Sequence, residues 1–484
     1  KSIEKNYIYN LIYQIVAIII PLITTPYLSR VLGAENIGIY GYALSISAYF
    51  ILFGSLGIAL YGKREIAYAQ NDNQKYTKIF WELFILRALS MIVSLIVFYF
   101  LLIKGNNTYN LYYKILFFEL IGELLDISWF FHGLEEFKKT VLRNLLIKLL
   151  SVICIFIFVK TKNDLYIYFI IYVLSILLGN LSLWLYLPKY LTRIKLKNLS
   201  IKKHIKETII LFIPQIAIQI YTVLDRTMIG YLVLDKSEVG YYTQGEKIIK
   251  LLLTIITALG TVMLPRIANE YSKGNNKKIE NYLYKSFNLV YFLSFPLIFG
   301  LISLSKNFVP LFFGSGYDKV VPIINILTPI ILLIGMSNVI GVQYLLPTKR
   351  QKEYTISVIL GAIVNFIMNL FLIKYYKAIG ASIATVFAEL TVTLIQLLFV
   401  RKDLKIKSIV RNSFQYLFSS IVMFGFTYLL SKLILNNIIS IIAQTFIGFI
   451  VYFVLLIIIK NDFIIEYINL IKLKIRRTYG KEKQ

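Results

Sequence analysis

Ionisable side chains inside long apolar runs are the residues of this chain whose types and spacing point to chemistry. Glu119, Glu123 and Asp126 follow one another at spacings of four and three residues, so a helix through them carries three carboxylates on one face. Such a group needs nearby cations or bound protons. Arg87 and Lys148 lie at a similar depth in neighbouring runs. Two interpretations stay open for these five residues: structural ion pairs, or a relay for H⁺ or another cation.

A second group of polar side chains occupies two later apolar runs. Its members are, in chain order, Gln215, Gln219, Asp225, Arg226, Glu246, Lys247 and Lys250. The basic members outnumber the acidic ones by one, and surplus positive charge suits a phosphate-bearing cargo. Contact with a cargo and structural pairing both stay open for this group. Glu389 stands alone in a further run, as a protonatable site or as a hydrogen-bonded core residue.

The elements that hold these residues are apolar enough to be membrane spans. Hydrophobic residues make up 58% of the 484 residues and charged ones only 16%, while the mean hydropathy is +0.71. A water-soluble domain carries roughly 25% charged residues. The composition therefore predicts an all-α, polytopic membrane protein, in which each span needs about 20 apolar residues.

Fourteen runs satisfy that length. They lie near 7–29, 36–61, 79–103, 110–132, 143–159, 164–187, 207–233, 238–264, 285–304, 320–347, 354–373, 378–400, 412–431 and 438–459. The segments outside the spans fall alternately on the two sides of the membrane. Of the 52 Lys and Arg residues, 36 lie in the segments on the side that includes both ends of the sequence, and 10 lie in the segments on the other side. The positive-inside rule then places both termini in the cytoplasm.

The net charge of +27 does not indicate a nucleic-acid partner, because basic residues stand between the apolar runs and aromatic residues stand inside them. Two His and one Cys are too few for a His/Cys metal cage, and no metal site or cofactor is expected. No P-loop, HExxH or GxSxG motif occurs, and no predicted loop is long enough for a catalytic domain. The chain is therefore not expected to be an enzyme.

An internal repeat organises the spans. Residues 32–40 align with residues 234–242 at an offset of 202 residues, and the same offset carries Arg64 onto Arg266. Six spans separate the two copies, and an even number preserves their orientation. The sequence predicts two parallel six-helix lobes around a central cavity, with two further helices. The predicted parts are residues 1–188, a basic cytoplasmic linker at 189–206, residues 207–400, and residues 401–484 with a basic tail.

The opening segment at residues 20–33, IPLITTPYLSRVLG, followed by IGIY at 37–40, resembles bacterial polysaccharide flippases. These Wzx-like O-antigen, capsule and teichoic-acid exporters belong to the multidrug/oligosaccharidyl-lipid/polysaccharide (MOP) superfamily, which also contains the MATE-type transporters. LPR at 264–266 and LFFGSGY at 311–317 look like further marks of the family. The resemblance covers nearly the whole chain. It implies a V-shaped transporter that opens alternately to each side of the bacterial cytoplasmic membrane.

The resemblance also implies a cargo, an oligosaccharide on undecaprenyl pyrophosphate that is flipped to the outer leaflet. A composition rich in Lys, Ile, Asn and Tyr suggests an AT-rich genome and a Gram-positive host, which favours a teichoic-acid or capsule precursor over O-antigen. A glycan polymerase or ligase is a candidate protein partner, and coupling to H⁺, Na⁺ or the membrane potential stays open. The alternatives are a multidrug/cation antiporter, a lipid II flippase and a membrane scaffold that transports nothing.

Overall fold

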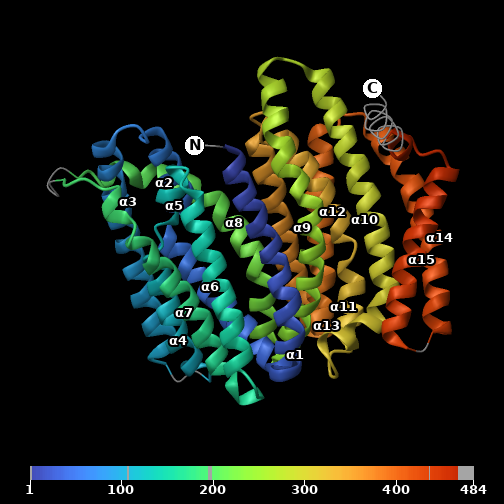
Figure 1. Cartoon of the computed structure of the whole chain (residues 1–484), viewed down its shortest axis with the longest axis horizontal. Helices are drawn as coiled ribbons and strands as arrows, with labels where there is room; N and C mark the ends of the chain where they lie inside the picture. The colour runs from blue at the N-terminus through green and yellow to red at the C-terminus, as the bar shows by residue number, and fades with distance from the viewer. Residues whose placement is uncertain (1–2, 106–107, 195–198, 435, 467–484) are drawn as a thin grey trace, which may run out of the picture. The chain divides into compact units, whose positions relative to one another are not determined.

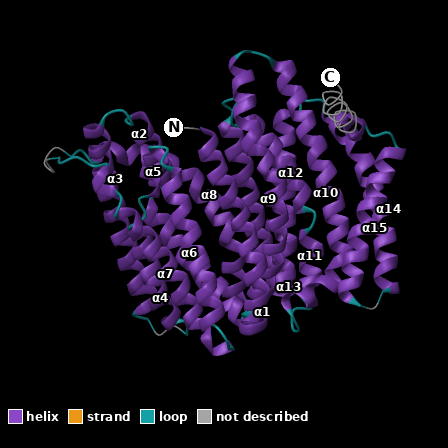
Figure 2. Ribbon diagram, in the orientation of Figure 1, coloured by secondary structure: helices purple, strands orange, loops and turns teal. Residues whose placement is uncertain are grey.

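The computed structural model of this chain describes residues 3–105, 108–194, 199–434 and 436–466. Figure 2 shows helices and loops, and no β-strand occurs among these residues. The predicted all-helical fold class is confirmed. Contacts between helices divide the chain into unit 1 (Lys1–Thr243) and unit 2 (Gln244–Gln484). Nothing in this division tests the domain boundaries expected from the sequence, which stay a prediction.

Unit 1 is a bundle in which the first helix packs against several later ones, as coloured from blue to green in Figure 1. Its α-helices are α1 (Ile3–Ser55), α2 (Ile58–Tyr68), α3 (Asn73–Phe98), α4 (Asn110–Leu124), α5 (Ser128–Gly133), α6 (Phe137–Phe158), α7 (Leu165–Trp184) and α8 (Lys202–Leu232). Short helices η1 (Tyr99–Ile103), η2 (Lys162–Asp164) and η3 (Leu187–Lys189) join them. Helix α1 packs against α3, α4, α6 and α8.

Unit 2 holds the longest uninterrupted helices. Its elements are α9 (Ser237–Ser272, which begins in unit 1), α10 (Asn276–Phe313), α11 (Val320–Leu327), α12 (Ile330–Ser337), η5 (Asn338–Leu345), α13 (Gln351–Val400), α14 (Ile406–Leu433) and α15 (Asn437–Ile458). Helix α10 packs against α11, α12, α14 and α15, and so forms the centre of this unit.

Ten helical segments in the described part of the chain are long and apolar enough to cross a membrane. Two of them each cover two expected spans, because α1 breaks at Gly33 (φ 80°) and α13 breaks at Lys377 (φ 51°). A positive φ turns the chain sharply, and glycine adopts it without strain. The expected spans at 110–132 and 207–233 correspond to α4–α5 and α8, which do not meet the same criterion. The count of fourteen spans stays a prediction.

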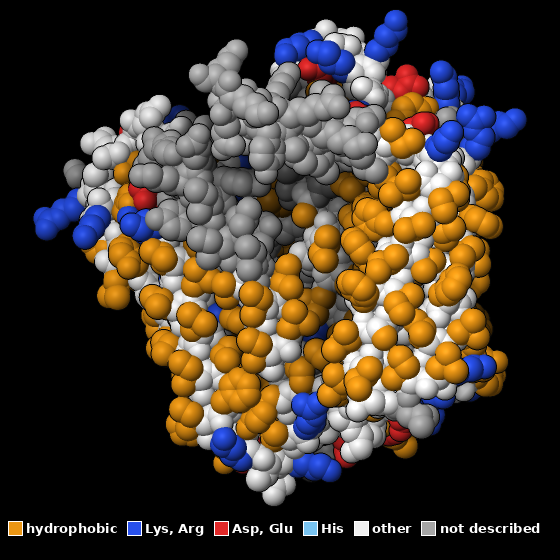
Figure 3. All heavy atoms as spheres, turned by 45° about the vertical axis from the view of Figure 1, so that its right-hand side comes forward, with side chains coloured by type: hydrophobic (Ala, Val, Ile, Leu, Met, Phe, Trp, Pro, Cys, Tyr) orange, Lys and Arg blue, Asp and Glu red, His pale blue; other side chains and the backbone are white. Residues whose placement is uncertain are grey.

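The surface of the helices is apolar where a soluble protein would be polar. Along α3, for example, Leu89, Val93 and Ile96 are more than half exposed. In Figure 3 hydrophobic side chains cover the sides of the helices, and Lys and Arg side chains lie at their ends. This distribution is typical of a multi-pass membrane protein, in which lipid replaces water around the apolar faces.

The two copies of the internal repeat meet within unit 1. A Cβ atom added to Gly38 would lie 1.7 Å from the backbone oxygen of Lys236, and one added to Gly240 would lie 2.0 Å from that of Ala34. The offset of 202 residues relates Gly38 to Gly240 and Ala34 to Lys236. The crossing is therefore symmetric, since each glycine contacts the carbonyl four residues before its counterpart.

Candidate functional site

Glu119 is the most deeply buried acid of the first charged group. It lies on α4 with 3% of its surface exposed, and its Oε1 accepts a hydrogen bond of 2.8 Å from the Tyr172 hydroxyl on α7. Its Oε2 is buried without a hydrogen-bond partner among the described residues. A buried carboxylate without a cation is costly, and binding a proton removes that cost. This geometry can hold an exchangeable proton.

Arg87 brings the other two acids of this group together. Its Nη2 lies 3.6 Å from Glu123 Oε2 and 3.8 Å from Asp126 Oδ2, and the side chain is 2% exposed. Nη2 and Nε also donate to the backbone oxygen of Glu123, at 2.6 and 3.1 Å. Helix α4 ends at Leu124. The Arg87 guanidinium therefore also binds a carbonyl in the last turn of α4.

Asp126 is not on the helix that carries Glu119 and Glu123, so the expectation of three carboxylates on one helical face is wrong. Helix α4 ends at Leu124, and Asp126 Oδ1 accepts a 2.9 Å hydrogen bond from the backbone nitrogen of Ser128. Aspartate side chains compete with the helix for backbone donors, and here that turn begins α5. The carboxylate still reaches Arg87, from a loop.

The polar group in this part of unit 1 includes two residues that sequence reasoning missed. Arg143 on α6 donates to the Gly179 carbonyl at 3.0 Å and to Asn180 Oδ1 at 3.3 Å. Asn180 in turn donates to the Gly122 carbonyl on α4 at 2.9 Å. Arg143 stands at the edge of the predicted span at 143–159 and Asn180 carries no charge, so only their packing reveals them. Lys148, the expected second cation, is a partly buried residue of the same helix α6.

Asp225 is one of two buried acids of the second charged group and is 6% exposed on α8. Tyr242, at the start of α9, donates a 2.5 Å hydrogen bond to Asp225 Oδ2. Arg226 is the next residue of α8 and is partly buried. Gln215 and Gln219 lie earlier on this helix, and the Gln215 amide donates to the Leu211 carbonyl of its own helix at 3.3 Å.

The remaining predicted site residues belong to unit 2. Glu246 and Lys250, one turn apart on α9, form an ion pair of 2.6 Å, and the lysine side chain stays 49% exposed. Lys247 is the neighbour of Glu246 on the same helix and is partly buried. Glu389 is 8% exposed in the second half of α13. The cavity candidates are thus divided between the units, and their assembly around one cargo stays a prediction.

A buried polar cluster at the start of α8 also escaped the sequence reasoning. The His204 ring bonds Tyr61 Oη at 2.8 Å through Nδ1, and Glu82 Oε2 at 2.9 Å through Nε2. Glu82 is fully buried and also accepts from Lys203 Nζ at 2.8 Å and from the Ser200 backbone nitrogen at 2.6 Å. The cluster fastens the start of α8 to α2 and α3. The sequence carries only a weak signal for this cluster. Glu82 is an acid inside the predicted span at 79–103, and His204 lies in the basic segment at 189–206.

The opposite end of α8 is capped by a lysine. Lys236 Nζ donates to the backbone oxygens of Gly230 and Val233, at 2.5 and 3.0 Å, and lies 5.2 Å from the centre of the Tyr42 ring. A cation there satisfies carbonyls that the last turn leaves unpaired. Burial lowers the pKa of Lys236, against the opposing effect of Asp235.

Unit 2 contains an apolar groove of about 440 Å³ between α9, α10, α14 and α15. Its walls are almost entirely hydrophobic and include Leu252, Leu297, Phe449 and Phe453. Gly300 widens one wall, because among the described residues the only neighbour of an added Cβ atom within 4 Å is Met423 Cε at 3.9 Å. Such a groove suits an extended hydrocarbon chain.

Buried polar side chains fix the walls of this groove. Ser303 on α10 donates to Gln444 on α15 at 3.0 Å, and Asn307 donates to Ser440 at 3.0 Å. Nearer the other end of α15, the Tyr452 hydroxyl donates to the Phe292 carbonyl at 2.9 Å. Hydrogen bonds between apolar helices hold their spacing, so the groove belongs to a fixed frame.

Comparison with known proteins assigns the chain to a family. The family model for polysaccharide biosynthesis proteins matches residues 3–271, more than half of the sequence. The chain belongs to this family. A second model, for the MatE family, matches residues 211–371. The resemblance inferred from the opening segment is therefore confirmed, and the chain is a Wzx-like member of the MOP superfamily.

One relative covers most of the chain and another covers about half of it. The putative O-antigen transporter of Escherichia coli K12 is 27% identical over 406 residues, which is 83% of this chain and 97% of that protein. A probable low-salt glycan biosynthesis flippase of Haloferax volcanii is 23% identical over 48% of this chain and 49% of that protein. These family members are transporters and flippases, not enzymes.

Solved structures share the fold. The lipid II flippase MurJ in an inward closed conformation aligns over 95% of this chain and 100% of its own, with a TM-score of 0.76 and 19% identity. An inward-facing multidrug transporter of the MATE family aligns over 81% of this chain and 95% of its own, with a TM-score of 0.64 and 13% identity. At these identities the likeness concerns the fold alone.

Proposed function

We propose that this protein flips an oligosaccharide linked to undecaprenyl pyrophosphate, a teichoic-acid or capsule precursor, across the bacterial cytoplasmic membrane. The observation that carries the proposal is the similarity to a putative O-antigen transporter over 97% of that relative's length. The proposed transport runs from the cytoplasmic to the outer leaflet by alternating access, with both termini in the cytoplasm. A glycan polymerase or ligase is the proposed partner that receives the cargo.

The apolar groove of unit 2 supports a polyprenyl-linked cargo. The lipid tail of such a cargo stays in the hydrocarbon layer, while the glycan and its pyrophosphate must leave the water. The groove offers the tail about 440 Å³ of apolar space beside α9. We propose that the tail is held there while the headgroup crosses.

The charged residues of α8 and α9 support a headgroup with phosphate. Arg226 can bind a phosphate through two donors, and Lys250 supplies a half-exposed ammonium group. Their attraction offsets part of the desolvation cost of moving a pyrophosphate through a medium of low dielectric constant. Gln215 and Gln219 add neutral donors and acceptors for sugar hydroxyls.

Transport in proteoliposomes tests the proposal. Purified undecaprenyl-linked glycans are added to one leaflet, and protection from an external glycosidase reports their movement. We expect flipping of a pyrophosphate-linked glycan and none of a neutral lipid. The variants Arg226→Ala and Lys250→Ala are expected to reduce flipping without reducing the amount of folded protein. Normal flipping by the double variant would remove these residues from the model.

A multidrug/cation antiporter is the second candidate, favoured by the MatE match over residues 211–371. Such a transporter needs acidic residues that bind a cation, and unit 1 supplies the buried Glu119 and the partly buried Glu123 on α4. Extrusion of a fluorescent cation in place of glycan flipping would support this candidate. Lipid II belongs in the same assay, since a lipid II flippase shares the fold.

Coupling to H⁺, Na⁺ or the membrane potential completes the proposal. Moving one charge through a potential of 100 mV is worth about 2.3 kcal/mol. Glu119 is the best-placed proton carrier, because its carboxyl is buried beside a tyrosine hydroxyl. We propose that the Arg87 pairs with Glu123 and Asp126 are structural.

A further inference from the structure

A second cavity lies in unit 1, where the end of α7 meets α3. It has a volume of about 560 Å³, with Trp81 on α3 and Trp184 at the end of α7 on one side. The segment that follows α7 forms the rest of the lining. The residues from this segment are Leu187, Pro188, Leu191, Thr192, Arg193 and Ile194.

Hydrogen bonds and ring contacts hold the walls of this cavity in place. Trp184 Nε1 donates to the Leu125 carbonyl at 2.8 Å, and its ring packs edge to face on Phe84 with centres 4.9 Å apart. The segment after α7 is tied to α3, because the Thr192 backbone nitrogen donates to Thr77 Oγ1 at 3.2 Å. The cavity is therefore formed without a ligand.

The charged residue that lines the cavity is Arg193, and the segment that carries it is basic. Residues 187–206 contain seven Lys and Arg residues and no Asp or Glu. Arg193 lines the cavity with an exposed side chain. Glu82 follows Trp81 on α3, but its carboxylate is fully buried and bonded to Lys203 and His204. An anion in the cavity would thus meet a guanidinium and no competing carboxylate from its lining.

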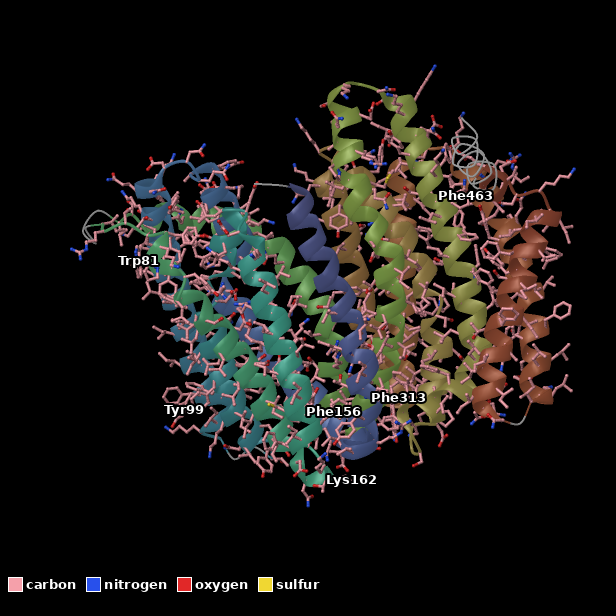
Figure 4. All side chains as sticks on the ribbon, in the orientation of Figure 1. Trp81, Tyr99, Phe156, Lys162, Phe313 and Phe463 are labelled. Atoms are coloured by element: carbon pink, nitrogen blue, oxygen red, sulfur yellow. The ribbon has the colours of Figure 1, made fainter. Side chains whose placement is uncertain are left out.

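The position of the cavity points to a lipid. Figure 4 shows Trp81 on the left-hand side of unit 1, in the upper half of the helices. Beyond Trp81 along α3, Leu89, Val93 and Ile96 are exposed and apolar, on the surface that acyl chains would cover. Tryptophan and arginine are the side chains that membrane proteins place at the level of lipid headgroups.

We propose that this cavity binds one anionic phospholipid of the surrounding bilayer. The phosphate contacts Arg193, the glycerol backbone lies between the indoles of Trp81 and Trp184, and the acyl chains follow α3. The site goes beyond the proposed transport, because its occupant is a bilayer lipid and not the cargo. Binding is set by charge, so a zwitterionic lipid occupies it less.

Tryptophan fluorescence tests the site directly, since two of the three tryptophans of the chain line it. The third, Trp129, is 1% exposed and serves as background. The full-length protein is placed in phosphatidylcholine bilayers that contain a small fraction of brominated phosphatidylglycerol or of brominated phosphatidylcholine. We expect the anionic lipid to quench the fluorescence with about fivefold higher apparent affinity, the ratio given by about 1 kcal/mol of charge-assisted bonding.

Two variants separate a site from general attraction. Arg193→Gln is expected to abolish the preference, while Lys402→Gln, an exposed basic residue of unit 2, leaves it unchanged. Trp81→Phe and Trp184→Phe should each remove part of the quenching. Equal quenching by both lipids, or equal loss in Arg193→Gln and Lys402→Gln, would overturn the proposal. Displacement by undecaprenyl pyrophosphate but not by unlabelled phosphatidylglycerol would also overturn it, since the cavity would then belong to the cargo.

Discussion

Two carboxylates on one helix have different surroundings in this protein. Glu119 has a tyrosine hydroxyl for a partner, whereas Glu123 lies beside the guanidinium of Arg87. A cation stabilises the ionised form of a carboxyl group, and a neutral buried site stabilises the protonated form. The proposed roles follow this difference, with proton exchange at Glu119 and a structural ion pair at Glu123.

Replacing Glu119 with Gln tests proton exchange. The amide keeps the size of the side chain and an acceptor for Tyr172, but it cannot titrate. We expect flipping to lose its stimulation by an imposed pH gradient, roughly tenfold for one pH unit if one proton is coupled. The measurement is the initial flipping rate in proteoliposomes with and without the gradient. Full stimulation in the variant would exclude Glu119 as the proton carrier, and Glu65→Gln is the control.

Replacing Arg87 with Gln tests the structural ion pairs. Glu123 and Asp126 would then face each other without the buried cation, and we expect a destabilisation of about 3 kcal/mol. Thermal unfolding of the purified protein measures this change. Arg64→Gln is the matched control, because the Arg64–Glu65 pair is partly exposed and exposed pairs contribute about 1 kcal/mol or less. Equal stability of the two variants would contradict the assignment.

At the scale of elements, the crossing at Gly38 and Gly240 depends on the absence of side chains. Substituting Ala for Gly within a helix normally stabilises it by about 1 kcal/mol. Here the added methyl group at position 38 would lie 1.7 Å from the Lys236 carbonyl oxygen. We expect Gly38→Ala to destabilise the protein by about 1–3 kcal/mol and to reduce flipping.

Gly425 on α14 is the control for this crossing, because an added Cβ atom there has no neighbour within 4 Å in the described part of the chain. Gly425→Ala should leave stability and flipping unchanged or slightly raised. Thermal unfolding and the flipping assay measure both variants. A Gly38→Ala protein as stable as Gly425→Ala would show that the helices tolerate a wider separation.

The groove of unit 2 gives a second prediction at this scale. Gly300→Phe places a ring in the groove without a backbone clash, since Met423 alone of the described residues lies within 4 Å of an added Cβ atom. We expect flipping of a full-length undecaprenyl cargo to fall about tenfold, and that of a short-chain analogue to fall less. Gly425→Phe adds the same ring outside the groove as the control. Equal losses for both chain lengths would argue against tail binding there.

At the scale of the whole molecule, the distribution of basic residues predicts which ends of the helices face the cytoplasm. The chain has a single cysteine, Cys154, so a Cys154→Ser background permits single-cysteine labelling. In intact cells an impermeant maleimide should label Asn163→Cys and should not label Asn71→Cys. Both positions are exposed, and the reverse pattern would invert the topology.

The sequence by itself determined the class of the protein. The high hydropathy requires a membrane protein, because exposure of apolar side chains such as those along α3 to water is unfavourable. The repeat at an offset of 202 residues identified residues 32–40 and 234–242 as equivalent segments. The motif at residues 20–33 indicated the family. These properties depend on composition and local order, which folding does not change.

The tertiary structure decided which polar groups meet. Asp126 lies beyond the end of α4 because its carboxylate bonds the Ser128 nitrogen, a competition that spacing alone does not reveal. The pairing of Asn180 with the Gly122 carbonyl and of His204 with Glu82 joins helices far apart in sequence. Hydropathy is a sum over neighbours along the chain, whereas hydrogen bonds and ion pairs depend on distances of a few ångströms between helices. Those distances are set only when the helices pack.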